Sequence, residues 1–274
     1  IHANAEVLVF YRMLFFSFFL YLFIRIIKKD SIKVSKKLLL KLVGIGSLMA
    51  FHWLFFFSSI KVSNVSIALS CLGTSTLFAA LLEPLIFKRK IDLSEIVMGI
   101  VIVICISLIF KVEFQYKLGI IYGLICALLG TIFSVFNGKL YGKTSSGNII
   151  FYEIFGGFLV ISLYYVFSGQ ISQIGEISYR DLALLTLLAS VFTAYPMFES
   201  VNLMKYISPF TLILTVNLEP IYGIILAFFI FGESEKMSAV FYGASLVMIL
   251  AIVINGVIKA RKKSKEIAIE NAQE

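Results

Sequence analysis

Charged residues are scarce in this sequence: only 15% of its 274 residues are Asp, Glu, Lys or Arg, while 60% are hydrophobic. An ordinary soluble domain carries about 25% charged residues. A water-soluble core does not hold this excess of apolar side chains, which also come in long uninterrupted runs rather than at amphipathic spacing. The composition therefore excludes an ordinary soluble protein, although the length alone would fit one or two soluble domains.

Thiols and imidazoles are also few. The three cysteines, Cys71, Cys105 and Cys126, all fall inside apolar runs and lack metal-ligand spacing, so we interpret them as small packing residues. With His2 and His52 as the only histidines, a histidine-based metal site is excluded. We therefore expect neither a disulfide framework nor a metal centre.

Signatures of enzymes and of ATP-driven pumps are missing too. The sequence has no G-x-x-x-x-G-K-[ST] loop and no soluble segment that would hold one. It also lacks a nucleophile with a base, or a cluster of ligands, at a common depth in the membrane. We predict that the protein is not an enzyme and needs no cofactor.

Long apolar runs dominate what is present. A helix needs about 20 mainly apolar residues to cross about 30 Å of hydrocarbon, whereas a barrel strand needs only about 9 to 11. The runs have the length of helices and show no period of two, so we predict an all-α membrane protein with nine transmembrane helices. The predicted spans cover residues 7–27, 42–60, 65–87, 94–110, 118–137, 149–167, 182–204, 210–231 and 238–258.

The basic residues gather on one side of the predicted membrane. The net charge of +8 raises the question of nucleic-acid binding. If the first span enters from outside, however, 18 Lys and Arg residues fall in inward loops and only 5 in outward loops. The positive-inside rule explains this charge without nucleic acid. We predict a multi-pass protein of a prokaryotic cell membrane, with residues 259–274 as a charged cytoplasmic tail.

An internal repeat divides the chain into two parts. A shift of 144 residues lays Gly99 on Gly243 without a gap between similar apolar patterns. Residues 1–117 hold four spans and residues 118–258 hold five, so we expect ten helices in the parent protein, with the first one missing here. Copies with an odd number of crossings face opposite ways. The pattern therefore predicts two inverted five-helix repeats, as in many secondary transporters.

The second half carries ordered motifs of a known family. Asn217-Leu218-Glu219-Pro220 is followed by an apolar run to Phe231-Gly232-Glu233, and then by Gly243 in the last span. In this order the motifs resemble the second half of EamA-type carriers of the drug/metabolite transporter superfamily. The resemblance implies ten helices with both termini in the cytoplasm, a central cavity between the halves, and alternating-access movement of amino acids, metabolites or drugs. The chain departs from the pattern by lacking the first helix, which lines the cavity in the family.

Glu219 and His52 are the ionisable residues nearest the middle of the predicted membrane, about 14 Å and about 15 Å from the start of their spans. Charged groups at this depth are costly and are candidates for function. The competing interpretations are a packing role for His52 and, for Glu219, a hydrogen bond to backbone freed by Pro220. Neutral polar stripes indicate further cavity-lining positions, although hydroxyls also join helices. The predicted solute-binding residues are His52, Trp53, Ser70, Thr74, Asn137, Tyr195, Glu199, Asn202, Thr215, Asn217 and Glu219.

Other charged residues in the spans receive structural interpretations. Glu83 lies near Lys88 and Arg89 and is expected to pair at the membrane interface. Arg12 and Glu153 are equivalent at a shift of 141, but inversion places them at different depths, so each should have its own local partner. The fifth span carries a stripe of small residues, which we interpret as a close-packing face rather than a binding site: Gly119, Gly123, Ala127 and Gly130, extended by Ser134.

The leading hypothesis is a secondary carrier, with export favoured, that moves a small metabolite, amino acid or drug-like solute by alternating access. One repeat would rock against the other around a midplane site. Glu219 or Glu199 would bind a proton and couple transport to the proton gradient, and a zwitterionic or cationic solute is favoured over an anion. The alternatives are a flippase for a lipid-linked molecule and a non-transporting scaffold or receptor. A homodimer is left open.

Overall fold

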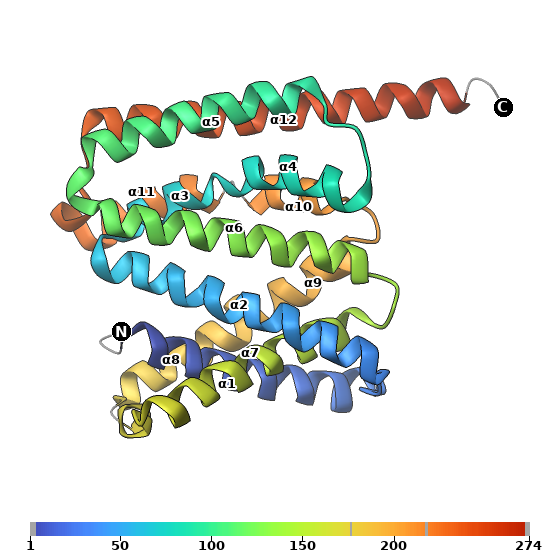
Figure 1. Cartoon of the computed structure of the whole chain (residues 1–274), viewed down its shortest axis with the longest axis vertical. Helices are drawn as coiled ribbons and strands as arrows, with labels where there is room; N and C mark the ends of the chain where they lie inside the picture. The colour runs from blue at the N-terminus through green and yellow to red at the C-terminus, as the bar shows by residue number, and fades with distance from the viewer. Residues whose placement is uncertain (1–3, 176, 217–218, 272–274) are drawn as a thin grey trace.

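The computed structural model describes residues 4–175, 177–216 and 219–271, and these residues are almost wholly helical (Figure 1). The helices are α1 (Ala5–Leu22), α2 (Lys36–Val62), α3 (Val65–Leu72), α4 (Ser75–Phe87), α5 (Leu93–Val112), α6 (Lys117–Leu140), α7 (Ser146–Ser168), α8 (Tyr179–Ala189), α9 (Tyr195–Leu203), α10 (Pro209–Val216), α11 (Glu219–Phe231) and α12 (Ala239–Asn271), with π-helical turns η1 (Phe23–Lys28) and η4 (Ser190–Ala194). The predicted all-α fold is confirmed for the described residues.

Among the described residues, eight helical segments are long and apolar enough to cross a membrane. They fall on eight of the nine predicted spans, including the short fourth span at α5. The remaining predicted span, 210–231, falls on α10 and α11, and residues 217–218 between them lie outside the described residues. The count of nine therefore stays a prediction, whereas the multi-pass membrane architecture is established.

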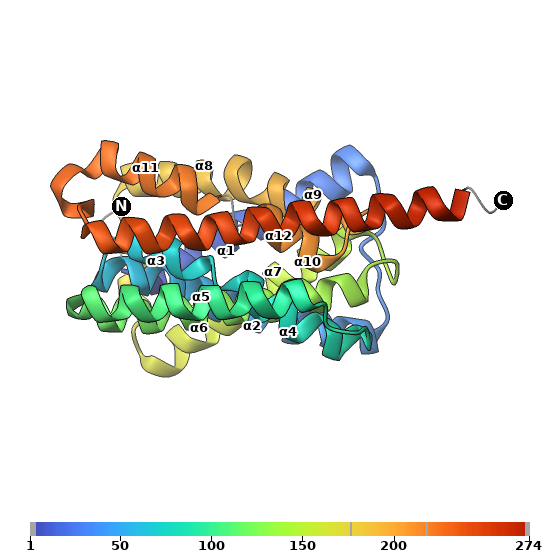
Figure 2. The same ribbon diagram turned by 90° about the horizontal axis from the view of Figure 1, so that it is seen from above.

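Side-chain caps determine where several helices begin. The hydroxyls of Ser35 and Ser145 accept hydrogen bonds from the backbone N–H groups three residues further on. Asp92 and Glu95 form a capping box at the start of α5. Such caps satisfy backbone donors that lack a partner in the first helical turn. These helices run in roughly the same direction across Figure 1, with α5 at the top and α2 and α7 in the lower part, and α5 runs along this direction in Figure 2 as well.

The buried apolar side chains of the described residues form two clusters. The first cluster joins α1, α2, α7, α8 and α9 with the end of α6, and the second joins α3, α4, α5, α10 and α12 with the start of α6. The helices of the first cluster lie in the lower part of Figure 1, and those of the second cluster lie in the upper part. Each cluster draws helices from both parts of the sequence. The predicted rocking of one sequence repeat against the other therefore does not match the packing, because helices of the two repeats interleave in each cluster.

Equivalent helices α1 and α7 of the two predicted repeats run in opposite directions. The ring of Phe10 lies 5.3 Å from the ring of Phe158, and the ring of Tyr21 lies 5.9 Å from that of Phe151. Residue numbers rise along one helix as they fall along the other, so the two helices are antiparallel. This is the relation expected of inverted copies.

The helix bounds also follow the two shifts found in the sequence. The span formed by α1 and η1 is Ala5–Lys28, and α7, 141 residues further on, is Ser146–Ser168. Helices α3 and α4 together form the span Val65–Phe87. At a shift of 144 this span corresponds to 209–231, where α10 begins and α11 ends. The sequence shifts therefore relate segments of equal extent.

The first part of the small-residue stripe on α6, at Gly119 and Gly123, packs against α2 and α3 as interpreted, whereas Gly130 and Ser134 line the cavity described below. The hydroxyl of Ser59 donates to the carbonyl of Gly119 at 2.7 Å. A Cβ added at Gly123 would lie 2.6 Å from the Cβ of Cys71. All three cysteines are buried free thiols. Small side chains at these positions let the helix backbones approach closely.

Arg89, in the turn between α4 and α5, is held by two carboxylates. Its Nη2 lies 3.0 Å from Glu83 Oε2 and 2.8 Å from Glu95 Oε1, so the predicted pairing of Glu83 at the interface is confirmed. Partial burial lowers the pKa of Arg89, but its hydrogen bonds with Glu95 and Glu83 outweigh that effect and raise the pKa above the ordinary value. This ion cluster ties the end of α4 to the start of α5.

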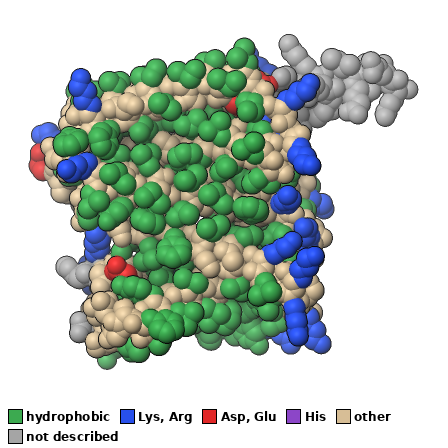
Figure 3. Space-filling model, viewed as in Figure 1, with side chains coloured by type: hydrophobic (Ala, Val, Ile, Leu, Met, Phe, Trp, Pro, Cys, Tyr) green, Lys and Arg blue, Asp and Glu red, His purple; other side chains and the backbone are tan. Residues whose placement is uncertain are grey.

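The surface divides into an apolar belt and a basic end. Figure 3 shows hydrophobic side chains across the middle of the visible face, and Lys and Arg side chains gathered mainly at the right-hand end. In Figure 1 the C-terminal part of α12 projects from this same end. The belt is the surface that lipid tails would cover, since exposed apolar side chains in this quantity do not suit water.

Candidate functional site

A cavity of about 330 Å³ lies between the two clusters. Its walls are largely apolar, with aromatic and sulfur-containing side chains such as Phe56, Phe133 and Met197. A smaller set of polar and charged side chains reaches it from α1, α2, α4, α6, α9, α11 and η4. This set comprises Arg12, His52, Trp53, Ser75, Thr131, Ser134, Asn137, Thr193, Ser200 and Glu219.

Arg12 places a cation in this cavity. Its guanidinium carbon lies 3.9 Å from the centre of the Trp53 ring and 5.7 Å from that of Phe57. Its Nη2 donates to the hydroxyl of Thr193 at 2.9 Å, while its Nε finds no acceptor among the described residues. Stacking on an aromatic face stabilises a cation by about 2 kcal/mol or more where water is excluded. Arg12 is thus held in place, and its Nε can still donate a hydrogen bond.

Glu219, the first residue of α11, lines the same cavity. Its carboxylate interacts electrostatically with the guanidinium of Arg12. The ion pairs of the described residues do not include these two groups, so they are not in direct contact. The cavity therefore holds one positive and one negative side chain that are close enough to interact and remain apart.

His52 is fixed by the backbone of α6. Its Nδ1 lies 2.8 Å from the carbonyl oxygen of Cys126, which accepts, so Nδ1 carries the hydrogen. A Cβ added at Gly130 would lie 2.8 Å from the His52 ring, so the absence of a side chain there makes room for the imidazole. His52 lines the cavity as predicted and also has the packing role that was the alternative interpretation.

Asn137 and Glu153 form a fully buried pair beside the cavity. Asn137 lines the cavity from α6, and its Nδ2 donates to Oε2 of Glu153 on α7 at 3.1 Å. Glu153 does not contact Arg12, whose hydrogen-bond partner is Thr193. The prediction that Arg12 and Glu153 each have a separate local partner is therefore confirmed.

Three hydroxyls of the predicted site take part in other contacts. The hydroxyl of Ser70 lies 3.2 Å from that of Ser245 on α12, and Thr74 Oγ1 donates to the carbonyl of Cys71 at 2.6 Å. Thr215 Oγ1 donates to the carbonyl of Thr211 at 3.0 Å. These side chains are not among those that line the cavity. Hydroxyls often join helices or bond to their own backbone in membrane proteins, and here they do so.

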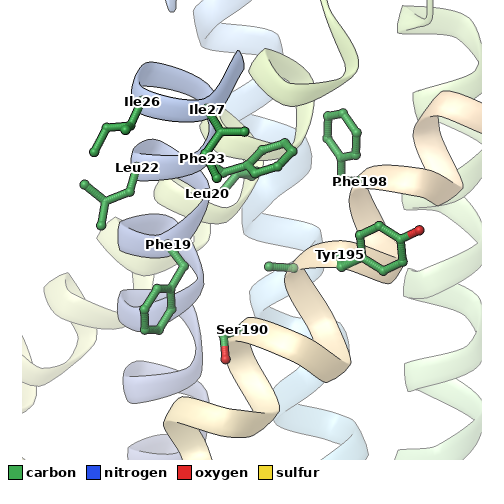
Figure 4. A pocket seen from close by; sticks show the side chains of 10 residues that line it. Phe19, Leu20, Leu22, Phe23, Ile26, Ile27, Ser190, Tyr195 and Phe198 are labelled. Atoms are coloured by element: carbon green, nitrogen blue, oxygen red, sulfur yellow. The ribbon is translucent and has the colours of Figure 1, made fainter. Parts of the chain in front are cut away.

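The sequence spacing places Tyr195, Glu199 and Asn202 on one face of α9, but this polar stripe faces away from the cavity. Asn202 Nδ2 donates to Glu199 Oε2 at 3.4 Å. Tyr195 is 67% exposed and lines a separate apolar groove (Figure 4), which runs between α1 with η1 and α9 with η4 and also includes Phe198. The cavity face of α9 instead carries Ser200 and its apolar neighbours. The other predicted residue, Asn217, lies outside the described residues.

Sequence reasoning misses six of the polar residues that line the cavity: Arg12, Ser75, Thr131, Ser134, Thr193 and Ser200. For Arg12 a signal exists, because a charged residue inside a span is by itself a candidate for function. Thr193 lies in the π-helical turn η4, directly before α9. A π-helical turn holds more residues than an α-helical one, so it changes which residues of the next helix face inward. The spacing of the α9 stripe is helical, but spacing does not reveal its direction.

Comparisons with known proteins agree with this architecture. Residues 2–111 match the sequence model of the EamA-like transporter family. One crystal structure of a protein matches 94% of this chain and 88% of its own, with a TM-score of 0.64 and 13% identity, which shows a likeness of fold alone. No match was found among curated proteins. The predicted resemblance is confirmed over residues 2–111, which are similar to the EamA-like transporter family.

Proposed function

We propose that this protein is a secondary transporter that moves a small solute by alternating access and exports it from the cytoplasm. The observation that carries the proposal is the cavity between the two clusters, which holds Arg12 and Glu219 apart from each other. Charged side chains inside a membrane are costly and usually mark a substrate or ion pathway. The family match supports transport in general and leaves the solute to be argued from the cavity.

The cavity chemistry favours a zwitterion with an apolar body. A guanidinium with a free Nε suits a carboxylate, which it binds with charge-assisted hydrogen bonds. Glu219 across the cavity suits an ammonium group. Apolar walls, including Met49 and Leu212, suit an aliphatic side chain that projects from the carbon carrying both charged groups. An apolar α-amino acid has this arrangement of groups, and its size is compatible with the cavity.

The two clusters are the bodies that would move. The antiparallel relation of α1 and α7 supports two inverted repeats, the design found in many secondary transporters. Because each cluster contains helices of both repeats, alternating access would rock the first cluster against the second. The cavity between them would then open to either side in turn.

Loading from the cytoplasm is supported by the position of the cavity. Asn137 lies near the end of α6, and Met204 directly follows α9, so the cavity extends toward the end of the molecule that carries Lys139 and Lys205. The positive-inside rule assigns this basic end, with the C-terminus, to the cytoplasm. A cavity that reaches the cytoplasmic end is the state in which an exporter takes up its solute.

Coupling to the proton gradient is part of the proposal. Of the two glutamates favoured by the sequence, Glu219 lines the cavity, whereas Glu199 bonds to Asn202 outside it. A glutamate in the transport pathway is where intramembrane proton binding is expected. Solute accumulation in vesicles should therefore follow an imposed pH gradient.

The test is transport by purified protein in proteoliposomes with three matched probes. Radiolabelled leucine carries both charges, leucinamide only the positive one and N-acetyl-leucine only the negative one. We expect saturable exchange of leucine and at least tenfold slower exchange of the other two. Equal rates for all three would contradict the zwitterion assignment, and no flux of any probe in either direction would contradict transport of this solute class.

A further inference from the structure

The pair formed by Glu153 and Asn137 contains more hydrogen-bond acceptors than donors. Both residues are 0% exposed. Asn137 Nδ2 donates to Glu153 Oε2 at 3.1 Å. The other oxygen of each group, Glu153 Oε1 and Asn137 Oδ1, is buried and has no hydrogen-bond partner among the described residues. Two buried acceptors without a donor are costly, since each has lost its bonds to water.

A single proton on Glu153 would satisfy both oxygens. An ionised carboxylate only accepts hydrogen bonds, and so does an amide oxygen. With a proton on Oε1, the carboxyl group becomes a donor, and the amide oxygen of the same Asn137 is its natural acceptor. The two groups would then exchange a pair of hydrogen bonds, as an amide and a carboxylic acid do. One added proton would therefore give a hydrogen-bond partner to both oxygens that lack one.

Charged groups on the neighbouring helices are directed elsewhere. On α1, Arg12 is bound to a threonine hydroxyl and an aromatic face. On α2, His52 is bound to a backbone carbonyl of α6, and on α9, Glu199 is bound to an asparagine. Lys139, on α6, is exposed. No described positive charge therefore takes the place of a proton at Glu153.

We infer that Glu153 binds a proton in this conformation and releases it into the cavity when a solute engages Asn137. The inference rests on the proposed transport function and assigns its coupling proton to Glu153 instead of Glu219, which stays ionised to hold the ammonium group of the solute. In the release step, the O–H bond at Oε1 breaks and a water molecule in the cavity takes the proton. The remaining carboxylate keeps its hydrogen bond from Asn137 Nδ2. Asn137 is the link, because it contacts both the cavity and the carboxyl group.

The protonation state is measured by infrared spectroscopy of the protein in lipid nanodiscs, without any solute. At about pH 7 we expect a carboxylic-acid C=O band in the wild type that is absent in Glu153→Gln and present in Glu219→Gln. Glutamine has the shape of the protonated acid and donates to Asn137 in the same way, so this variant should fold. Asn137→Ser should shift the band, and it serves as a second probe should Glu153→Gln fail to fold. A wild-type spectrum without the acid band, or a band that persists unshifted in both variants, would overturn the inference.

The coupling role is measured with leucine in proteoliposomes. Glu153→Gln should retain leucine exchange in the absence of a gradient, because no net proton movement is needed. It should lose accumulation driven by a pH gradient, which in the wild type exceeds that without a gradient at least fivefold. Gradient-driven accumulation by Glu153→Gln at the wild-type level would refute the coupling role. If the wild type shows neither exchange nor accumulation, the proposed transport fails, while the infrared result still decides whether Glu153 holds a proton.

Discussion

Arg12 and Arg89 are the same residue type in two contrasting environments. Arg89 makes charge-assisted hydrogen bonds to two carboxylates, Glu83 and Glu95, in the turn between α4 and α5. Arg12 makes one hydrogen bond to a neutral hydroxyl and stacks on Trp53, and its Nε has no described acceptor. Arg89 thus has its charge balanced by neighbouring carboxylates, whereas Arg12 can still donate a hydrogen bond to a further partner.

The difference in their partners indicates that Arg89 stabilises the fold, whereas Arg12 is available to bind a solute in the cavity. A saturated arginine at the edge of the membrane joins two helices and gains nothing from an added ligand. An arginine in a cavity, with a glutamate nearby and not in contact, is stabilised further when an anionic group binds it. Substitutions that separate these two roles, from the largest effect to the smallest, test this comparison.

Replacing Arg12 should have the largest effect, and the effect should fall on transport. Arg12→Gln removes the charge and keeps a donor for Thr193. Loss of one charge-assisted contact of about 1.5–3 kcal/mol corresponds to leucine exchange about 10 to 150 times slower. The control is Arg25→Gln, because Arg25 is exposed in η1 and bonds only to the backbone of Asp30. Equal leucine exchange rates for the two variants would show that Arg12 does not bind the solute.

Two glycines in α2 give the next largest contrast, this time in stability. A Cβ added at Gly46 would collide with the backbone oxygen of Glu153, which has no room to move, whereas Gly44 faces open space. Gly46→Ala should lower the free energy of unfolding by about 1–3 kcal/mol. Gly44→Ala should leave it unchanged or raise it by up to about 1 kcal/mol, because alanine favours helix. Melting in detergent measures both, and a stable Gly46→Ala would mean that α2 and α7 are not in such close contact.

Replacing Arg89 should cost stability and leave transport unchanged. Arg89→Gln leaves two buried carboxylates without their cation, but partial exposure lets water replace some contacts, so we expect a loss of about 1–2 kcal/mol. The pKa of Arg89 is raised above its ordinary value, so the stability that its charge supplies is present at every pH below that ordinary value and is lost only at higher pH. Arg89 does not titrate between pH 6 and pH 8. Its titration should therefore not change the difference in melting temperature between the wild type and Arg89→Gln over this range. A variant that melts normally but exchanges leucine poorly would reverse the roles assigned here.

Much of the fold follows from the sequence, because apolar runs and basic loops report directly on the membrane. The shifts of 141 and 144 residues in the sequence likewise predict which pairs of helical segments have similar lengths. The cavity is harder to predict. Four of its residues, His52, Trp53, Asn137 and Glu219, are found from their depth and polarity. The stripe on α9 is misplaced because a π-helical turn precedes it, and hydroxyls such as Ser70 look the same in a sequence whether they face a cavity or a neighbouring helix.

Two serines give the smallest and most selective contrast. Ser70 is fully buried and bonds to Ser245, whereas Ser200 lines the cavity and bonds to the carbonyl of Pro196 within its own helix. Ser70→Ala should lower the free energy of unfolding by about 1 kcal/mol and leave leucine exchange unchanged, because it removes one bond between helices. Ser200→Ala should leave melting within about 0.5 kcal/mol and alter only the apparent affinity for leucine, by a few fold. If Ser70→Ala changed the affinity and Ser200→Ala did not, the boundary between cavity and scaffold would lie on α3 rather than on α9.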